Sequence, residues 1–189
     1  MVTDYVTDAS AWKRWQQEYQ FGVLLIIPPD PPLAQVNALR ARYAWSQTSE
    51  CPAHISLTIP LPRPLTSTDW EALAMIAAAI PSFDIHYGPL QHYLPHPGVC
   101  LAISPQAQLA SLCAALETAA CFTGAQPRRY PFSAQMTIAE IITVEQTASI
   151  MVELANEVPR GTFRCTDVTY AVPDGEFRFT ERGRLALAR

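Results

Sequence analysis

The sequence has little glycine and few charged residues, and both shortages limit what the protein can be. Only 7 of its 189 residues are glycine and 17 are proline, so rigid turns are expected and a mobile glycine-rich phosphate loop is not. The nucleotide and hydrolase patterns GxxxxGK, GxGxxG, GxSxG and HExxH are also absent. Charged residues make up 16% and the net charge is −4. A long basic track along nucleic acid is therefore not expected, whereas a small site for a nucleotide or an RNA end needs only a few local donors.

Cysteine spacing and hydrophobic run length exclude further classes. The five cysteines are odd in number and form no CxxC pair: Cys51, Cys100, Cys113, Cys121 and Cys165. We expect reduced, mostly buried thiols, with no disulfide framework, no metal site and no cofactor. The longest apolar run, residues 21–27, is too short to span a bilayer. Because the chain opens with no signal-peptide pattern, we expect a cytoplasmic protein that does not enter a membrane; its oligomeric state stays open.

The apolar content, 49% of 189 residues, indicates one globular domain spanning 1–189. Periodicity predicts helices at 8–19, 31–43, 66–80, 109–120 and 143–158, the third and fifth opening with capping boxes. Strands are predicted at 21–27, 54–59, 83–87, 99–103, 132–141, 163–165, 168–172 and 177–179. Both halves follow the order strand, helix, strand, helix, strand, without a Gly/Ser-rich linker. This order predicts an α+β fold built from two pseudo-symmetric lobes.

Two strands carry the same chemical pattern, AHISL at 53–57 and AQMTI at 134–138. Because strand side chains alternate between faces, His54 and Ser56 share one face, with Thr58 next along, and Gln135 and Thr137 share the corresponding face. The intervening apolar residues then point to a core. If the two strands face each other across a groove, an imidazole, an amide and two hydroxyls surround a small anion. The alternative for all four residues is an ordinary polar strand face in contact with water.

The remaining candidates have more than one interpretation. His92 and His96 are four residues apart, but nearby prolines argue against the helix that a metal pair would need. An alternative is that His86, His92 or His96 enters the groove and adds a second imidazole to it. Arg128 and Arg129 suit either phosphate contact or a solvated loop. The aromatic residues at 12, 15 and 19 favour core packing over a base-stacking platform.

The paired motifs resemble the two-histidine (2H) phosphoesterases, which include the LigT-like 2′-5′ RNA ligases and cyclic nucleotide phosphodiesterases. Members carry two His-x-Thr/Ser motifs. His54-Ile55-Ser56 fits the first motif, and in the second Thr137 matches whereas Gln135 replaces histidine. The resemblance covers nearly the whole chain. It implies lobes that each contain an antiparallel sheet with helices on the outer face, around a central groove.

The resemblance also implies a chemistry. One histidine is the general base, the other protonates the leaving oxygen, and the hydroxyls bind phosphoryl oxygens. His54 would be the retained catalytic residue, and Ser56, Gln135 and Thr137 would bind a 2′,3′-cyclic or 2′-5′ phosphodiester of a nucleotide or RNA end. Glutamine cannot carry a proton, so we expect impaired catalysis. The alternatives are an inactive nucleotide- or RNA-end-binding module and an interaction domain with an incidental groove.

Overall fold

The computed structural model describes residues 4–43 and 50–189. Its strands are β1 (Val23–Ile26), β2 (Ile55–Ser56), β3 (Phe83–His92), β4 (Gly98–Ser104), β5 (Gln135–Glu140), β6 (Gly161–Cys165), β7 (Asp167–Pro173) and β8 (Phe179–Ala186). Its helices are α1 (Arg14–Gln17), α2 (Pro32–Arg42), α3 (Ser67–Ala78), α4 (Gln106–Glu117), α5 (Val144–Glu153) and the short 3₁₀ helix η1 (Ala120–Phe122). None of the helices in this part of the chain is long and apolar enough to cross a membrane.

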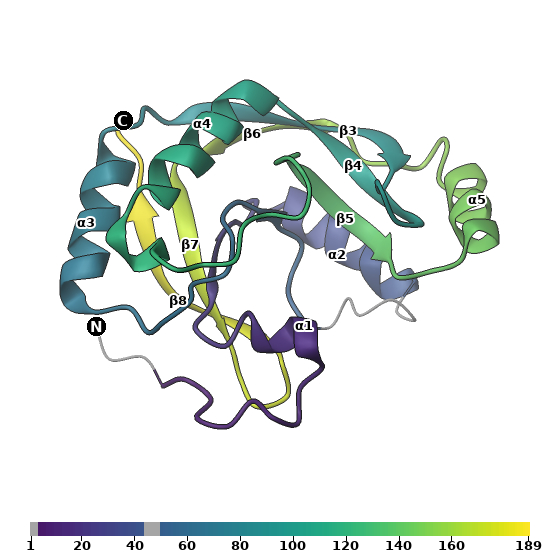
Figure 1. Cartoon of the computed structure of the whole chain (residues 1–189). Coiled ribbons are helices and arrows are strands. Elements are labelled where there is room, and N and C mark those ends of the chain that lie inside the picture. Colours follow the sequence, from purple (N-terminus) through teal and green to yellow (C-terminus); the bar gives the residue numbers. More distant parts are fainter. Residues whose placement is uncertain (1–3, 44–49) are drawn as a thin grey trace.

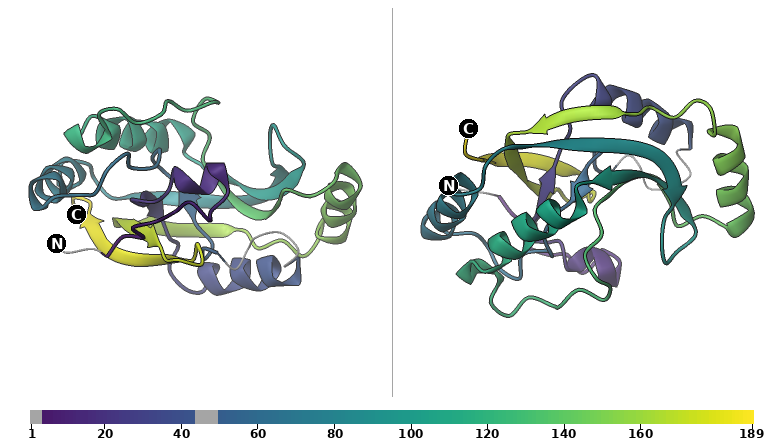
Figure 2. Two further views of the ribbon diagram at one scale, coloured as in Figure 1. Left: turned by 60° about the horizontal axis from the view of Figure 1, so that its bottom comes forward. Right: turned by 90° about the horizontal axis from the view of Figure 1, so that it is seen from above.

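The strands form one curled sheet in the order β6-β3-β4-β5-β2-β1-β7-β8, and its neighbouring strands are antiparallel. Figure 1 shows α3 and α5 at opposite ends of the molecule, and Figure 2 shows α2 and α4 on opposite sides of it. The predicted α+β class with an antiparallel sheet is confirmed. The strands of both halves join in one continuous sheet, so a separate sheet for each lobe is not confirmed.

One face of the sheet carries the main hydrophobic core. Leu24 and Ile26 of β1, Ile55 of β2 and Met136 of β5 are among its fully buried members, together with residues from helices α2 to α5. The helices begin where capping predicts: the Thr66 side chain accepts a hydrogen bond from the Asp69 N–H at the start of α3, and Thr143 caps α5 in the same way. The predicted starts of α3 and α5 are therefore confirmed.

The predicted helix at 8–19 is wrong in extent, because α1 covers only Arg14–Gln17. The aromatic residues of this segment pack on the turn between β7 and β8 instead of forming one long helical stripe. The rings of Trp15 and Tyr19 lie 5.4 and 6.2 Å from that of Phe177. The Trp12 Nε1–H also donates to the Gly175 carbonyl at 3.2 Å. The predicted core packing is confirmed for Tyr19, which packs against Val23, Leu25 and Ala171, but not for Trp15, which stays exposed.

Motif strand β2 is shorter than predicted because a bulge ends it. The N–H groups of Leu57 and Thr58 both donate to the Leu24 carbonyl, at 3.2 and 3.3 Å. The Thr58 hydroxyl accepts a hydrogen bond from the Leu24 N–H at 3.2 Å and is buried. The expectation that Thr58 continues the polar row of His54 and Ser56 is therefore wrong.

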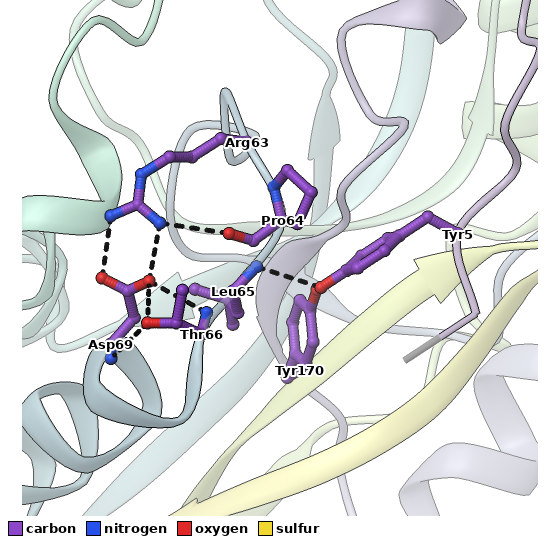
Figure 3. A network of polar contacts seen from close by, with 7 residues as sticks. All are labelled: Tyr5, Arg63, Pro64, Leu65, Thr66, Asp69 and Tyr170. Atoms are coloured by element: carbon purple, nitrogen blue, oxygen red, sulfur yellow. Dashed lines mark hydrogen bonds and ion pairs between the residues drawn. The ribbon is translucent and has the colours of Figure 1, made fainter. Parts of the chain in front are cut away.

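A polar network anchors the chain that leaves β2 (Figure 3). Arg63 donates to both carboxylate oxygens of Asp69, at 2.6 and 2.8 Å, and the same carboxylate accepts from the Thr66 N–H. The Leu65 N–H donates to the Tyr5 hydroxyl, which lies 2.9 Å from that of Tyr170. The segment after the first motif is thus held to both α3 and β7.

Candidate functional site

The two motif strands are neighbours in the sheet. Ile55 of β2 pairs with Met136 of β5 in antiparallel register, so His54 lies beside Thr137 and Ser56 lies beside Gln135. Ile55 and Met136 are fully buried on the core face. The structure therefore brings the four predicted site residues together on the opposite face, although side by side in one sheet rather than across from each other. Ser56 is exposed there, and His54, Gln135 and Thr137 are half-buried.

The residue before each motif is held by a side-chain amide from a helix of its own half. Ala53 donates its N–H to Asn37 Oδ1 of α2 at 2.8 Å, and Ala134 donates its N–H to Gln106 Oε1 of α4 at 2.9 Å. The Gln106 amide also donates to the Ala134 carbonyl at 2.7 Å. Both alanines are fully buried. The sequence repeat is thus matched by a repeat in how the two motifs are supported.

Arg40 supports the site in a way that the sequence analysis missed. This buried α2 residue donates to the Thr137 carbonyl at 2.7 Å and to the Cys51 carbonyl at 2.9 Å. It connects the second motif to the chain just before the first. Helical spacing could have indicated its burial, because Arg40 lies four residues after Val36 and therefore on the buried side of α2.

The His54 ring is held in one tautomer. Its Nδ1 lies 2.7 Å from the Pro52 carbonyl oxygen, which only accepts, so Nδ1 carries the hydrogen. Burial, opposed by this hydrogen bond and assisted by the Arg40 charge, lowers the pKa of His54 to about 4. His54 is therefore neutral near pH 7 and keeps a lone pair on Nε2. Within residues 4–43 and 50–189 this nitrogen has no hydrogen-bond partner.

Gln135 lies against the next strand. The Cys100 thiol of β4 is 3.5 Å from Gln135 Oε1 and donates to it. Burial raises the pKa of the Cys100 thiol to about 11, so it stays protonated. This contact uses the amide oxygen and leaves the NH₂ group, which has no partner among the described residues, as a donor for a ligand.

Glu140 is a further residue of this face that the sequence analysis missed. The register shifts between the Cys100–Thr137 and Val99–Ala139 pairs, and this irregularity returns Glu140, opposite Gly98, to the site side of β5. Burial and the nearby Glu140 carboxylate raise the pKa of Tyr93 above its ordinary value. The margin of the site thus carries a negative charge.

Among the described residues, the side chains of the other three histidines make no hydrogen bond to the four predicted site residues. His86 Nδ1 is 2.7 Å from the Thr162 hydroxyl, which joins β3 to β6. His92 is exposed, and the His96 ring lies 6.0 Å from that of Tyr130. Among the described residues, no group of three or more His, Cys, Asp or Glu side chains is placed to hold a metal ion.

The two candidate phosphate-contacting arginines differ. Arg128 pairs with Glu117 at 2.7 Å and donates to the Leu57 carbonyl at 2.7 Å. The Glu117 carboxylate also accepts from the Ile59 N–H at 2.8 Å. Arg128 therefore braces the chain after the first motif, whereas Arg129 is exposed.

The comparisons with known proteins concern the family and the fold of the chain. A model of the 2′-5′ RNA ligase superfamily matches residues 28–176. Apo E. coli LigT has a TM-score of 0.58 and 19% identity, covering 88% of this chain and 96% of that chain. E. coli LigT complexed with 3′-AMP has a TM-score of 0.59 and 19% identity, over 88% and 97%. A protein from Thermus thermophilus has a TM-score of 0.58 and 14% identity, over 87% and 96%.

Comparison with curated proteins gives no match. At these identities the structural matches establish the fold, and the family model, which covers most of the sequence, establishes the relationship. The resemblance of the chain to the LigT-like 2H phosphoesterases is confirmed. The chain belongs to the 2′-5′ RNA ligase superfamily and has the LigT-like phosphoesterase fold.

Proposed function

We propose that the protein binds the 2′,3′-cyclic or 2′-5′ phosphodiester of a nucleotide or RNA end and acts on it with impaired catalysis. The observation that carries this proposal is the contrast between two neighbouring groups on one sheet face. His54 offers a lone pair on Nε2, whereas Gln135 offers only amide hydrogens. One group accepts a proton and the other cannot supply one.

In this proposal His54 accepts the proton of the attacking water or ribose hydroxyl. The hydroxyls of Ser56 and Thr137 and the amide of Gln135 donate hydrogen bonds to the phosphoryl oxygens. The leaving oxygen lacks the proton donor that a second histidine would provide. General acid catalysis typically contributes about 10²–10⁴ in rate, so turnover should be slow by about that factor.

Solved structures of E. coli LigT with phosphate, 3′-AMP, ATP and NADP+ make nucleotides a reasonable class of probe for this chain. The second candidate function is binding of a nucleotide or RNA end without turnover. It is favoured by the same Gln135, because a donor amide suits an anion site that performs no chemistry. The two candidates share a binding step, so binding is the first property to test.

The test is an NMR titration of the protein with inorganic phosphate and with 3′-AMP. We expect weak, salt-sensitive binding that perturbs signals of His54 and Thr137. Thr137→Val removes one donor hydroxyl and should weaken binding. Thr180→Val makes the same change on β8, an edge strand separated from β2 by β1 and β7, and should not. If neither ligand perturbs His54 or Thr137 in the wild-type protein, both candidates are wrong and the interaction-domain alternative is preferred.

A further inference from the structure

Three consecutive residues before His54 each have a backbone group fixed by a side chain. The Cys51 carbonyl accepts from Arg40, the Pro52 carbonyl from the His54 ring, and the Ala53 N–H donates to Asn37. Asn37 and Arg40 both belong to α2 and are three residues apart, so they lie on the same side of the helix. One helix therefore fixes the backbone on both sides of the carbonyl that orients the imidazole.

We infer that Asn37 and Arg40 are positioning residues that aim the Pro52 carbonyl at Nδ1 of His54 and so reserve the Nε2 lone pair for the ligand. The inference rests on the proposed function, in which that lone pair accepts the proton. In this inference each residue acts through the backbone of residues 51–53.

The physical basis is the choice between the two neutral tautomers of histidine. The hydrogen bonds of the ring decide which nitrogen carries the hydrogen, because a nitrogen that faces an acceptor must be the one that donates. If the Pro52 carbonyl turns away, the hydrogen is free to move to Nε2. That nitrogen would then be a donor and would lose its ability to act as a base. Arg40 also connects this segment to the second motif, since it donates to the Thr137 carbonyl of β5 at 2.7 Å.

The experiment measures the His54 tautomer from its ring ¹⁵N shifts near pH 8, where the imidazole is neutral. In the wild-type protein we expect the hydrogen on Nδ1. Asn37→Ala and Arg40→Met should each give a mixture in which the Nε2–H form is present. Asn37→Asp, which keeps an acceptor oxygen for the Ala53 N–H, should restore the Nδ1–H form.

Arg42→Met is the matched control on the same helix. Arg42 is exposed and pairs with Glu153 and Glu157, so its loss should leave the His54 tautomer unchanged. An amide spectrum of each variant checks the fold. If a folded Asn37→Ala or Arg40→Met protein keeps the pure Nδ1–H tautomer, the inference is overturned. If Asn37→Ala and Arg40→Met no longer hold His54 in the Nδ1–H tautomer while the wild-type protein binds neither phosphate nor 3′-AMP, the positioning role is supported and the proposed function is wrong.

Discussion

Ile55 of β2 pairs with Met136 of β5, and this pairing brings both sequence motifs onto one surface. The two buried side chains point into the core, so the polar residues on either side of each must point away from it. A register shift of one residue would bury one of the two polar rows. The composition of the candidate site therefore depends on how these two short strands align.

The first prediction concerns the pH dependence of stability. Burial lowers the pKa of His54 to about 4 in the folded protein, whereas the unfolded chain should have a value of about 6.5. Protonation then favours the unfolded state. The contribution of neutral His54 to the free energy of unfolding should be fully present above about pH 6.5. It should be lost progressively as the pH falls toward 4.

Urea unfolding of wild type and His54→Ala between pH 4 and pH 8 measures this contribution. The difference in free energy of unfolding between the two proteins should change between about pH 4 and pH 6.5 and stay constant from there to pH 8. A difference that stays constant from pH 4 to pH 8 would show that His54 has an ordinary pKa and is well solvated.

The second prediction concerns the network that anchors the chain after β2. Hydrogen bonds from Arg63 and Thr66 hold the pKa of Asp69 well below its usual value. Asp69→Ala removes the capping box and both ion-pair contacts, so it should lower the free energy of unfolding by about 1–3 kcal/mol. Glu181→Gln, which breaks an exposed pair with Arg184, should change it by no more than about 0.5 kcal/mol.

Thermal or urea unfolding near pH 7 compares the two variants. The decrease in the free energy of unfolding caused by Asp69→Ala should become smaller as the pH falls below about 3.8, because Asp69 of the unfolded wild-type chain then becomes protonated. Equal, small effects of both substitutions would mean that the network in Figure 3 adds little to stability.

The third prediction concerns the histidines outside the motif. His86 is engaged with Thr162, and His96 packs near Tyr130. Single alanine substitutions of His86, His92 and His96 should leave the rate of 2′,3′-cyclic nucleotide hydrolysis unchanged within error. Loss of turnover in any one of them would identify it as the missing proton donor.

Much of this fold could be read from periodicity. Val36 of α2 and Tyr43 at its C-terminal cap are buried, and Thr66 and Thr143 cap their helices as the pattern predicts. Local patterns failed where tertiary contacts dominate. The bulge that turns Thr58 inward depends on two N–H groups sharing the Leu24 carbonyl. The pattern of one strand contains no information about such a partner.

The candidate site was likewise predictable only where local alternation determines it. Alternation predicts which faces His54, Ser56, Gln135 and Thr137 occupy, but the pattern does not show that the two strands are direct neighbours. Arg40 was missed because its role is to hold backbone carbonyls at residues 51 and 137. A carbonyl looks the same at every position of a sequence, so no residue type marks these contacts.

The most direct test of the account is to restore the second histidine. Gln135→His should raise hydrolysis of a 2′,3′-cyclic nucleotide by about 10²-fold or more, because it supplies the absent proton carrier. The gain should vanish in the double variant with His54→Ala, since the two histidines act as one unit. The measurement is release of the 2′- or 3′-monophosphate by wild type and by the single and double variants. A folded Gln135→His protein no faster than wild type, or a wild type that is already fast, would contradict the account.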